Sequence, residues 1–453
     1  MKSFSAFVLG GVASGSGKTL ISLGLMAALG RREVDVQPFK CGPDFIDPSL
    51  HKMVTGKVSS NLDLRMCGKQ FCKETFARRS ASADIGLVEG VMGLFDGGEA
   101  SSAALAVELG LPVVLVVDVR SAAQSVAAVL KGFECFSESV TVSGVIFNRV
   151  GSARHRELIE LAVRENCDAE IIGFLPRDEQ FEMPERHLGL HMGDEDPLPG
   201  GQLDRLVAVI EDNLDLDRLV EVCRVDRPPV ATVKDTAPVA EEERIRLGVA
   251  HDEAFCFYYE DNLDLFRQHG FEPVFFSPLH DRALPVELDA LYFGGGYPEL
   301  YAAELSDNGG FLESVHDFAD KQGVIYGECG GFMYLCDSLV DLDGKEHRMT
   351  GIFPARTRMG KRLSRLGYRE VALLADSPLG ACGDRLYGHE FHYSAVETMA
   401  EGVATAYRLN NGKGEGYRIG NCLASYVHLH FGRNQETLNC LGQFVRENKS
   451  RFG

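Results

Sequence analysis

Residues 6–19 read Ala-Phe-Val-Leu-Gly-Gly-Val-Ala-Ser-Gly-Ser-Gly-Lys-Thr, and this stretch decides the fold of the first part of the chain. Residues 6–10 form an apolar run that predicts a buried strand, and a helical pattern follows from Thr19 to Leu29. A glycine-rich loop between a strand and a helix binds phosphate, because its backbone N–H groups and the positive end of the helix dipole face the anion. The stretch therefore predicts a phosphate-binding loop.

The loop also predicts how a nucleotide and its metal ion are held. The loop backbone and the Lys18 ammonium would bind the phosphates of ATP, and the Thr19 hydroxyl would ligate Mg²⁺. The strict G-x-x-x-x-G-K-[ST] pattern fails at its first position, where Val12 stands, but the strand–loop–helix context compensates. The predicted nucleotide-binding residues are Ser14, Gly15, Ser16, Gly17, Lys18 and Thr19.

The same alternation of apolar strands and helices continues along the chain. The predicted strands of the first half are 6–10, 35–39, 85–88, 113–117, 142–147 and 170–173, with helices at 19–29, 101–108, 122–133 and 153–165. Strands that are apolar throughout and separated by helices indicate a parallel sheet covered on both faces. After a segment rich in proline and glutamate, strands recur at 247–250, 272–276, 290–293, 324–326 and 367–373.

These patterns predict an α/β protein of two domains, each a mostly parallel sheet with helices on both faces. The first domain spans 1–225, a linker spans 226–245, and the second domain spans 246–453.

Polar side chains follow several predicted strands, at the sheet edge where open α/β sheets bind their ligands. Asp44 and Glu89 are the predicted carboxylate ligands of Mg²⁺, together with Thr19, because Mg²⁺ prefers hard oxygen donors. Asp47 and Asp96 could substitute for them or position an acceptor substrate. Asn148 offers an amide for a nucleobase edge. Each acid taken singly could also be a loop or cap residue.

The second domain contains a turn that is typical of an enzyme nucleophile. The predicted strand 324–326 runs into Gly-Glu-Cys-Gly-Gly at 327–331, and small flanking residues allow the strained turn that exposes Cys329. A following helix would lower the pKa of the thiol. His428 and His430 are both candidate bases, and spacing alone does not separate them. The backbone of Gly295 and Gly296 is the predicted oxyanion site.

Composition limits the partners and the compartment. The 453 residues include 46 Lys and Arg against 66 Asp and Glu, a net charge of −20, which disfavours bulk binding to nucleic acid or an anionic membrane. The 12 cysteines form no C-x-x-C pair, which favours reduced thiols in a cytoplasm over a disulfide framework. The longest apolar run, Leu109–Val117, is too short to span a membrane.

These motifs together resemble known families. The phosphate loop, Lys40-x-Gly42-Pro43-Asp44-Phe45-Ile46-Asp47-Pro48 with His51, and Glu89-Gly90 look like a dethiobiotin-synthetase-like ATPase domain, which is P-loop NTPase-like. Gly294–Glu299, Gly327–Gly331 and Tyr426-Val427-His428 look like a class I glutamine amidotransferase of the cobyric-acid type. This domain order over essentially the whole chain is similar to the cobyrinate a,c-diamide synthase family, as are segments 184–190 and 388–394.

The resemblance implies a reaction. An enzyme of this family uses ATP, Mg²⁺ and L-glutamine to amidate the a and c acetates of a carboxylate-rich corrinoid through an acyl phosphate, in cobalamin biosynthesis. The catalytic histidine of the family's Tyr-x-His motif corresponds to His428, with His430 as the alternative. The usual third acid of the triad is expected to be missing, and no Glu stands two residues beyond either histidine.

A polyanionic acceptor needs local positive charge, and the densest basic run lies between residues 356 and 369. Arg362 and Arg365 are the predicted substrate contacts in it, although a solvated charged face is the simpler explanation. Hydrogenobyrinate and nickel-sirohydrochlorin remain open as acceptors, and a homo-oligomer is possible. A nucleotide-switch or partitioning ATPase is a competing class; Ala13, where such proteins carry a signature lysine, and the intact Cys329 turn argue against it.

Overall fold

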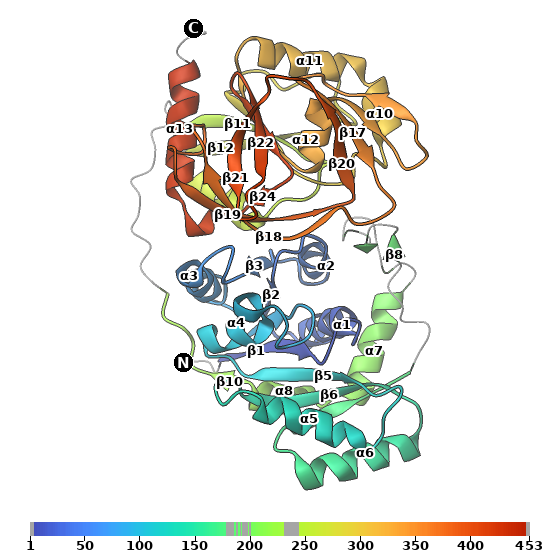
Figure 1. Ribbon diagram of the computed structural model, residues 1–453. Coiled ribbons are helices and arrows are strands. Elements are labelled where there is room, and N and C mark those ends of the chain that lie inside the picture. The colour runs from blue at the N-terminus through green and yellow to red at the C-terminus, as the bar shows by residue number, and fades with distance from the viewer. Residues whose placement is uncertain are drawn as a thin grey trace. The chain divides into compact units, whose positions relative to one another are not determined.

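The computed structural model describes residues 4–177, 185–186, 189–190, 192, 198, 201–230 and 244–449. The chain forms two compact units, Met1–Thr232 and Val233–Gly453, and each is described by itself (Figure 1). The division falls inside the range predicted as a linker. Most of that range, and Pro184, His187 and Leu188 of the family segment 184–190, lie outside the described residues.

The first unit is built on a parallel sheet with the strand order β3-β2-β4-β1-β5-β6-β7. Every neighbouring pair in this order is parallel, and β10 adds an antiparallel pair with β1. The strands are β1 (Phe4–Gly11), β2 (Val36–Cys41), β3 (Ser60–Leu62), β4 (Ile85–Glu89), β5 (Val113–Asp118), β6 (Val142–Val150), β7 (Glu170–Pro176) and β10 (Arg224–Val225), with a separate pair β8 (Glu185–Arg186) and β9 (Gly189–Leu190).

Helices cover both faces of this sheet. Phe7 and Leu9 of β1 join one hydrophobic core with residues of α1, α7 and α8. On the opposite face, a methyl group at Gly86 of β4 would lie 3.3 Å from the ring of Phe76 in α3. The α/β class predicted for the first unit is therefore confirmed. The helices are α1 (Lys18–Arg31), α2 (Ile46–Thr55), α3 (Lys69–Arg79), α4 (Ser102–Leu109), α5 (Ser125–Cys135), α6 (Ala153–Asn166), α7 (Gln202–Asn213) and α8 (Leu216–Val222).

The second unit is built on a ten-stranded sheet with the order β12-β11-β13-β14-β23-β22-β21-β18-β19-β24. Its first five strands pair in parallel, and all pairs from β23 to β24 are antiparallel. The strands are β11 (Ile245–Ala250), β12 (Phe271–Phe276), β13 (Ala290–Phe293), β14 (Val324–Glu328), β18 (Arg365–Leu373), β19 (Arg385–His392), β21 (Ala404–Leu409), β22 (Gly414–Ile419), β23 (Cys422–Ser425) and β24 (His428–Leu429).

A second, four-stranded sheet in this unit has the order β16-β15-β17-β20. The α/β class holds, but only half of the main sheet is parallel, which corrects the predicted mostly parallel sheet. The remaining elements are α9 (Glu260–Gln268), α10 (Ala302–Asp307), α11 (Gly309–Asp320), α12 (Gly330–Leu335), α13 (Glu436–Lys449), β15 (Cys336–Val340), β16 (Glu346–Arg348), β17 (Phe353–Met359) and β20 (Ser394–Met399).

No helix in the described parts of the chain has both the length and the apolar character needed to cross a membrane. All 12 cysteines are free thiols.

Candidate active sites

The phosphate loop follows β1 and ends at Gly17, which has a φ of +97° and precedes the first residue of α1. A methyl group at Gly17 would lie 2.3 Å from Nδ2 of Asn148, so glycine is required for steric as well as backbone reasons. The Asn148 amide donates to the Ser16 carbonyl at 2.9 Å and accepts from the Arg149 N–H at 2.9 Å. Asn148 therefore supports the loop, a contact that differs from the predicted pairing with a nucleobase.

Lys18 folds back across the loop. Its Nζ donates to the Met92 carbonyl at 2.6 Å and lies 3.3 Å from the Ala13 carbonyl, which also accepts from the Ser16 hydroxyl at 2.9 Å. Burial lowers the pKa of Lys18, and the nearby Lys40 cation lowers it further. The ammonium is thus held by carbonyl dipoles at the place where the loop would receive phosphate.

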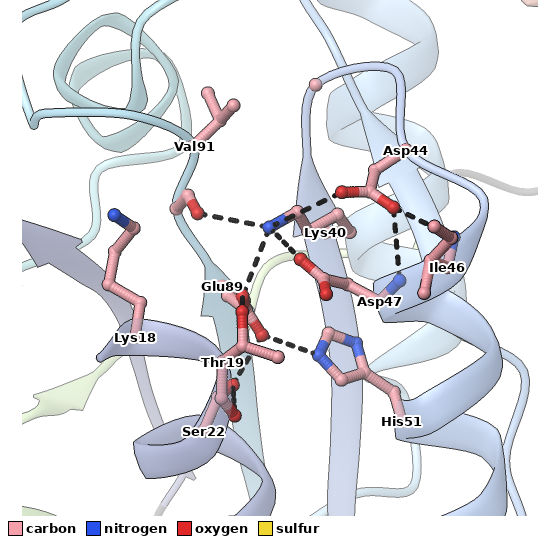
Figure 2. Close-up of polar contacts among 12 residues, drawn as sticks. Lys18, Thr19, Ser22, Lys40, Asp44, Ile46, Asp47, His51, Glu89 and Val91 are labelled. Atoms are coloured by element: carbon pink, nitrogen blue, oxygen red, sulfur yellow. Dashed lines mark hydrogen bonds and ion pairs between the residues drawn. The ribbon is translucent and has the colours of Figure 1, made fainter. Parts of the chain in front are cut away.

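Glu89, at the end of β4, is the centre of the polar cluster beside the loop (Figure 2). Its Oε1 accepts from the Thr19 hydroxyl at 2.8 Å, and its Oε2 accepts from the Ser22 hydroxyl and lies 2.8 Å from Nε2 of His51. Burial alone would raise the pKa of this carboxyl, but Lys40 and His51 outweigh burial and hold the pKa well below its usual range. Glu89 is therefore a buried, ionised carboxylate.

Lys40 is the last residue but one of β2 and stands opposite Glu89 in the sheet register. Its Nζ lies 3.1 Å from Glu89, 2.5 Å from Asp47 and 4.0 Å from Asp44, so three carboxylates converge on one buried ammonium (Figure 2). Burial would lower the pKa of Lys40, but Asp47 and Glu89 raise it well above the ordinary value. No role was predicted for Lys40, Ser22 or His51. A lysine inside a fully buried strand was the available signal for Lys40.

The other two predicted acids make local contacts. Oδ1 of Asp44 accepts from the backbone N–H groups of Ile46 at 2.8 Å and Asp47 at 3.0 Å, at the start of α2. Asp96 accepts from the Gly93 N–H at 3.0 Å, and its charge acts on Lys18. The structure thus gathers Thr19, Asp44, Asp47 and Glu89, while Asp96 stays on the neighbouring loop.

The donor set at Glu89 fits a metal that arrives with phosphate. Among the residues described, no group of three or more His, Cys, Asp and Glu is arranged to hold a metal ion. Thr19 and Glu89 instead present two oxygens next to the phosphate loop. Mg²⁺ usually takes one or two protein ligands and completes its shell with phosphate oxygens and waters, so these residues fit it.

The second site forms around Cys329, between β14 and α12. Cys329 has a φ of +49° and a ψ of −103°, a strained conformation for a residue with a side chain. Its backbone N–H donates to the Ser425 carbonyl at 2.7 Å. A methyl group at Gly331 would lie 2.2 Å from the Phe293 carbonyl, and one at Gly330 would lie 3.1 Å from the Gly296 nitrogen. The glycines therefore let the turn pack against the predicted oxyanion loop.

The pKa of the Cys329 thiol differs from the prediction. Burial raises the pKa of Cys329, and the nearby Glu299 raises it further, so the expectation of a lowered pKa was wrong. The reason is that Cys329 is only 7% exposed and that α12 has only 6 residues. A separate base must remove the thiol proton.

The two candidate histidines have different neighbours. A methyl group at Gly295 would lie 2.4 Å from Cε1 of His428, so this ring packs on the predicted oxyanion loop. Nδ1 of His430 instead accepts from the Gly432 N–H at 3.1 Å, and its ring packs on Tyr259 with 5.0 Å between centroids. Burial lowers the pKa of His430 to about 3 and that of His428 well below its ordinary value.

The basic run is partly neutralised within the second unit. Arg356 and Arg358 pair with Glu397, and Arg369 pairs with Glu390. Arg362 and Arg365 are exposed, and the Arg365 guanidinium donates to the Ser364 carbonyl at 3.1 Å.

Comparison with known proteins covers both units. Residues 7–190 match the model of the CobQ/CobB/MinD/ParA nucleotide binding domain, and residues 246–436 match the CobB/CobQ-like glutamine amidotransferase domain. The chain is 43% identical to the cobyrinate a,c-diamide synthase of Syntrophotalea carbinolica, over 97% of this chain and 98% of that one. It is 39% identical to the enzyme of that name from Salmonella typhimurium, over 96% of each chain. With this identity over nearly its whole length, the chain belongs to the cobyrinate a,c-diamide synthase family.

Proposed function

We propose that this protein is a glutamine-hydrolysing, ATP-dependent amidoligase that converts the a and c acetate carboxylates of cobyrinate into amides, in the cytoplasmic synthesis of cobalamin. One observation carries the proposal: a chain of this family keeps both a polar cluster around Glu89 at its phosphate loop and a strained Cys329 turn packed against the Gly295 loop. The first site supports phosphoryl transfer and the second supports release of ammonia.

Ammonia release would begin at Cys329. Because burial raises the pKa of the thiol, His428 would act as the base and take its proton. The sulfur then attacks the side-chain amide carbon of glutamine, and backbone N–H groups of Gly295 and Gly296 would stabilise the oxyanion. His428 returns the proton to the leaving ammonia, and water then hydrolyses the thioester to glutamate.

Activation of the acceptor would occur at the phosphate loop. Lys18 and the loop backbone would bind the phosphates of ATP, while Thr19 and Glu89, with Asp44 as a further candidate, would hold Mg²⁺. Bound Mg²⁺ supplies neutralisation of phosphate charge. The γ-phosphoryl group would pass to a substrate carboxylate, and ammonia would displace phosphate from the acyl phosphate to give the amide. Asp47 and Asp96 would position the acceptor, and Arg362 and Arg365 would bind its other carboxylates.

A mass-spectrometric assay with cobyrinate, ATP and Mg²⁺ tests the proposal, with glutamine or ammonium as the nitrogen source. Wild-type protein should give two successive amidations with either source. Cys329→Ser should lose at least about 10³-fold of the glutamine-dependent rate and keep the ammonium-dependent rate. Glu89→Gln should lose both syntheses and keep basal glutamine hydrolysis.

Cys135→Ser is the matched control, because this thiol is exposed and belongs to the first unit. It should behave as wild type. Hydrogenobyrinate and nickel-sirohydrochlorin are assayed in parallel. ATP hydrolysis without amidation of any of the three acceptors would contradict the proposal and favour a nucleotide switch.

A further inference from the structure

Glu328, the residue before the nucleophile, is a buried carboxylate that connects two strands. It ends β14 and is only 2% exposed. Its Oε1 accepts from the Tyr326 hydroxyl at 2.6 Å and from the backbone N–H of Leu429 at 3.0 Å, and its Oε2 accepts from the Tyr292 hydroxyl at 2.9 Å. These donors from β13, β14 and β24 fix the carboxylate between the strand that precedes Cys329 and the strand that carries His428.

The second oxygen of this carboxylate faces the imidazole. Oε2 of Glu328 lies 3.8 Å from Nδ1 of His428, and both residues are almost completely buried. The separation exceeds a hydrogen bond. Catalytic contacts in ligand-free enzymes are often longer than in the substrate complex, so we expect this one to shorten when the imidazole is protonated.

We propose that Glu328 is the positioning residue of the glutaminase site: its carboxylate orients His428 through Nδ1 and stabilises the imidazolium that forms when the base takes the Cys329 proton. The inference rests on the proposed function. It supplies, from the residue before the cysteine, the acid that is missing two residues after either histidine.

The need for such an acid follows from the surroundings of His428. Burial, followed by the neighbouring His389 and His392, lowers the pKa of His428, so the site disfavours an imidazolium. His389 stacks on the His428 ring with 5.0 Å between centroids. A carboxylate at Nδ1 offsets this cost and also selects the tautomer in which Nε2 carries no hydrogen and can accept a proton.

The variant Glu328→Gln tests the role above about pH 7, where the buried carboxyl group is ionised, because glutamine has the same shape without the charge. It should lower kcat for glutamine hydrolysis at least about 10²-fold with little change in KM. It should also raise the pH at which iodoacetamide begins to alkylate Cys329 rapidly. Ammonium-dependent amidation should stay at the wild-type rate, which reports that the protein is folded.

The pH profile involves several titratable groups besides Glu328, His428 and Cys329. Those whose charges interact with them are Tyr292, Tyr258, Tyr326, Tyr407, His389, His392, Glu299 and Glu390. All of them are retained in the variant. Glu415→Gln is the matched control, because this buried glutamate of the same unit accepts from the Tyr426 N–H at 3.1 Å. It should leave kcat and the alkylation profile within about threefold of wild type.

Three outcomes would count against parts of the interpretation. If Glu328→Gln keeps kcat within about threefold of wild type, the positioning role is wrong. If it loses glutamine-dependent and ammonium-dependent synthesis equally, with a lower Tm, Glu328 only stabilises the fold. If wild-type protein hydrolyses no glutamine at all, the proposed function itself fails.

Discussion

At the scale of single residues, the two histidines of β24 and the turn after it show how neighbours separate roles that spacing leaves open. His428 packs on Gly295 and faces Glu328, whereas His430 caps the backbone of Gly432. The first arrangement suits a base, because the ring packs on the predicted oxyanion loop and Nδ1 faces Glu328. The second suits a structural residue, because Nδ1 is already used.

Alanine substitution of each histidine therefore has a different expected effect. His428→Ala should lower kcat for glutamine hydrolysis at least about 10²-fold, and it should also lose about 1–3 kcal/mol of stability, because a buried ring that stacks on His389 is removed. His430→Ala should keep most of the activity and lose about 1–3 kcal/mol of stability, because a buried hydrogen bond and an aromatic contact are removed. Kinetics and urea unfolding of both variants check this. Equal loss of kcat in both would contradict the assignment.

At this scale, the sequence predicted the site residues that belong to a recognisable local motif. Lys18, Thr19 and Glu89 belong to motifs that bear on phosphate, and the Thr19 hydroxyl donates to Glu89, while Lys18 donates to carbonyls at the loop. Their roles with ATP and Mg²⁺ stay predictions. Lys40 and Glu328 were missed as partners. Their contacts depend on the register between neighbouring strands, which one strand's sequence does not encode.

At the scale of elements, α1 links the phosphate loop to the core of the first unit. A methyl group at Gly24 would lie 2.7 Å from Cγ1 of Ile210 and 3.1 Å from Cγ of Leu206, both in α7. Gly30, in the last turn of the same helix, has nothing within 4 Å of the corresponding position. The two glycines therefore form a matched pair on one helix.

Alanine at these positions should change stability in opposite directions. Gly24→Ala should cost about 1–2 kcal/mol, because overpacking against α7 exceeds the gain in helix propensity. Gly30→Ala should gain up to about 1 kcal/mol. All 13 tyrosines follow residue 232 and the chain has no Trp, so tyrosine fluorescence reports the unfolding of the second unit alone. The unfolding midpoint measured by circular dichroism should therefore shift, whereas the midpoint measured by tyrosine fluorescence should not. A shift in tyrosine fluorescence would contradict the expected confinement to the first unit.

The elements that the sequence predicted best are those buried on both sides. The strands β1, β4 and β5 are apolar runs, and their bounds agree with prediction within one or two residues. The strands β20 and β22 were missed, because they alternate irregularly between buried and exposed positions. Without a continuous apolar run, strands such as these give no signal above that of a loop.

At the scale of the whole molecule, the buried ionisable groups of the second unit make its stability depend on pH. Burial lowers the pKa values of His389 and His430 to about 3, below the ordinary value near 6.5. Burial raises the pKa values of Glu299 and Glu328 to about 7, above the ordinary value of 4.5. The unfolded chain therefore binds more protons at the histidines, and the folded unit binds more at the glutamates.

These two sets act in opposite directions as pH changes. Each histidine lowers the free energy of unfolding by about 1.4 kcal/mol per pH unit as pH falls from about 6.5 toward 3. Each glutamate lowers the free energy of unfolding by about the same amount per pH unit as pH rises from about 4.5 to about 7, because its carboxyl group ionises first in the unfolded chain. Since other carboxylates also titrate, the informative quantity is the difference between a variant and wild type, in which they cancel.

Two variants should change the slope of stability against pH with opposite signs. Between about pH 5 and pH 6.5, Glu328→Gln removes a group that holds its proton when folded, so stability should rise with pH more steeply, by about 1.4 kcal/mol per unit. His430→Ala removes a group that stays neutral when folded, so the slope should fall by a similar amount. Urea unfolding followed by tyrosine fluorescence at several pH values isolates the second unit and measures both slopes. Parallel curves for the variants and wild type would mean that these groups titrate alike in the folded and unfolded chains, since only a difference in bound protons can tilt the free energy of unfolding with pH.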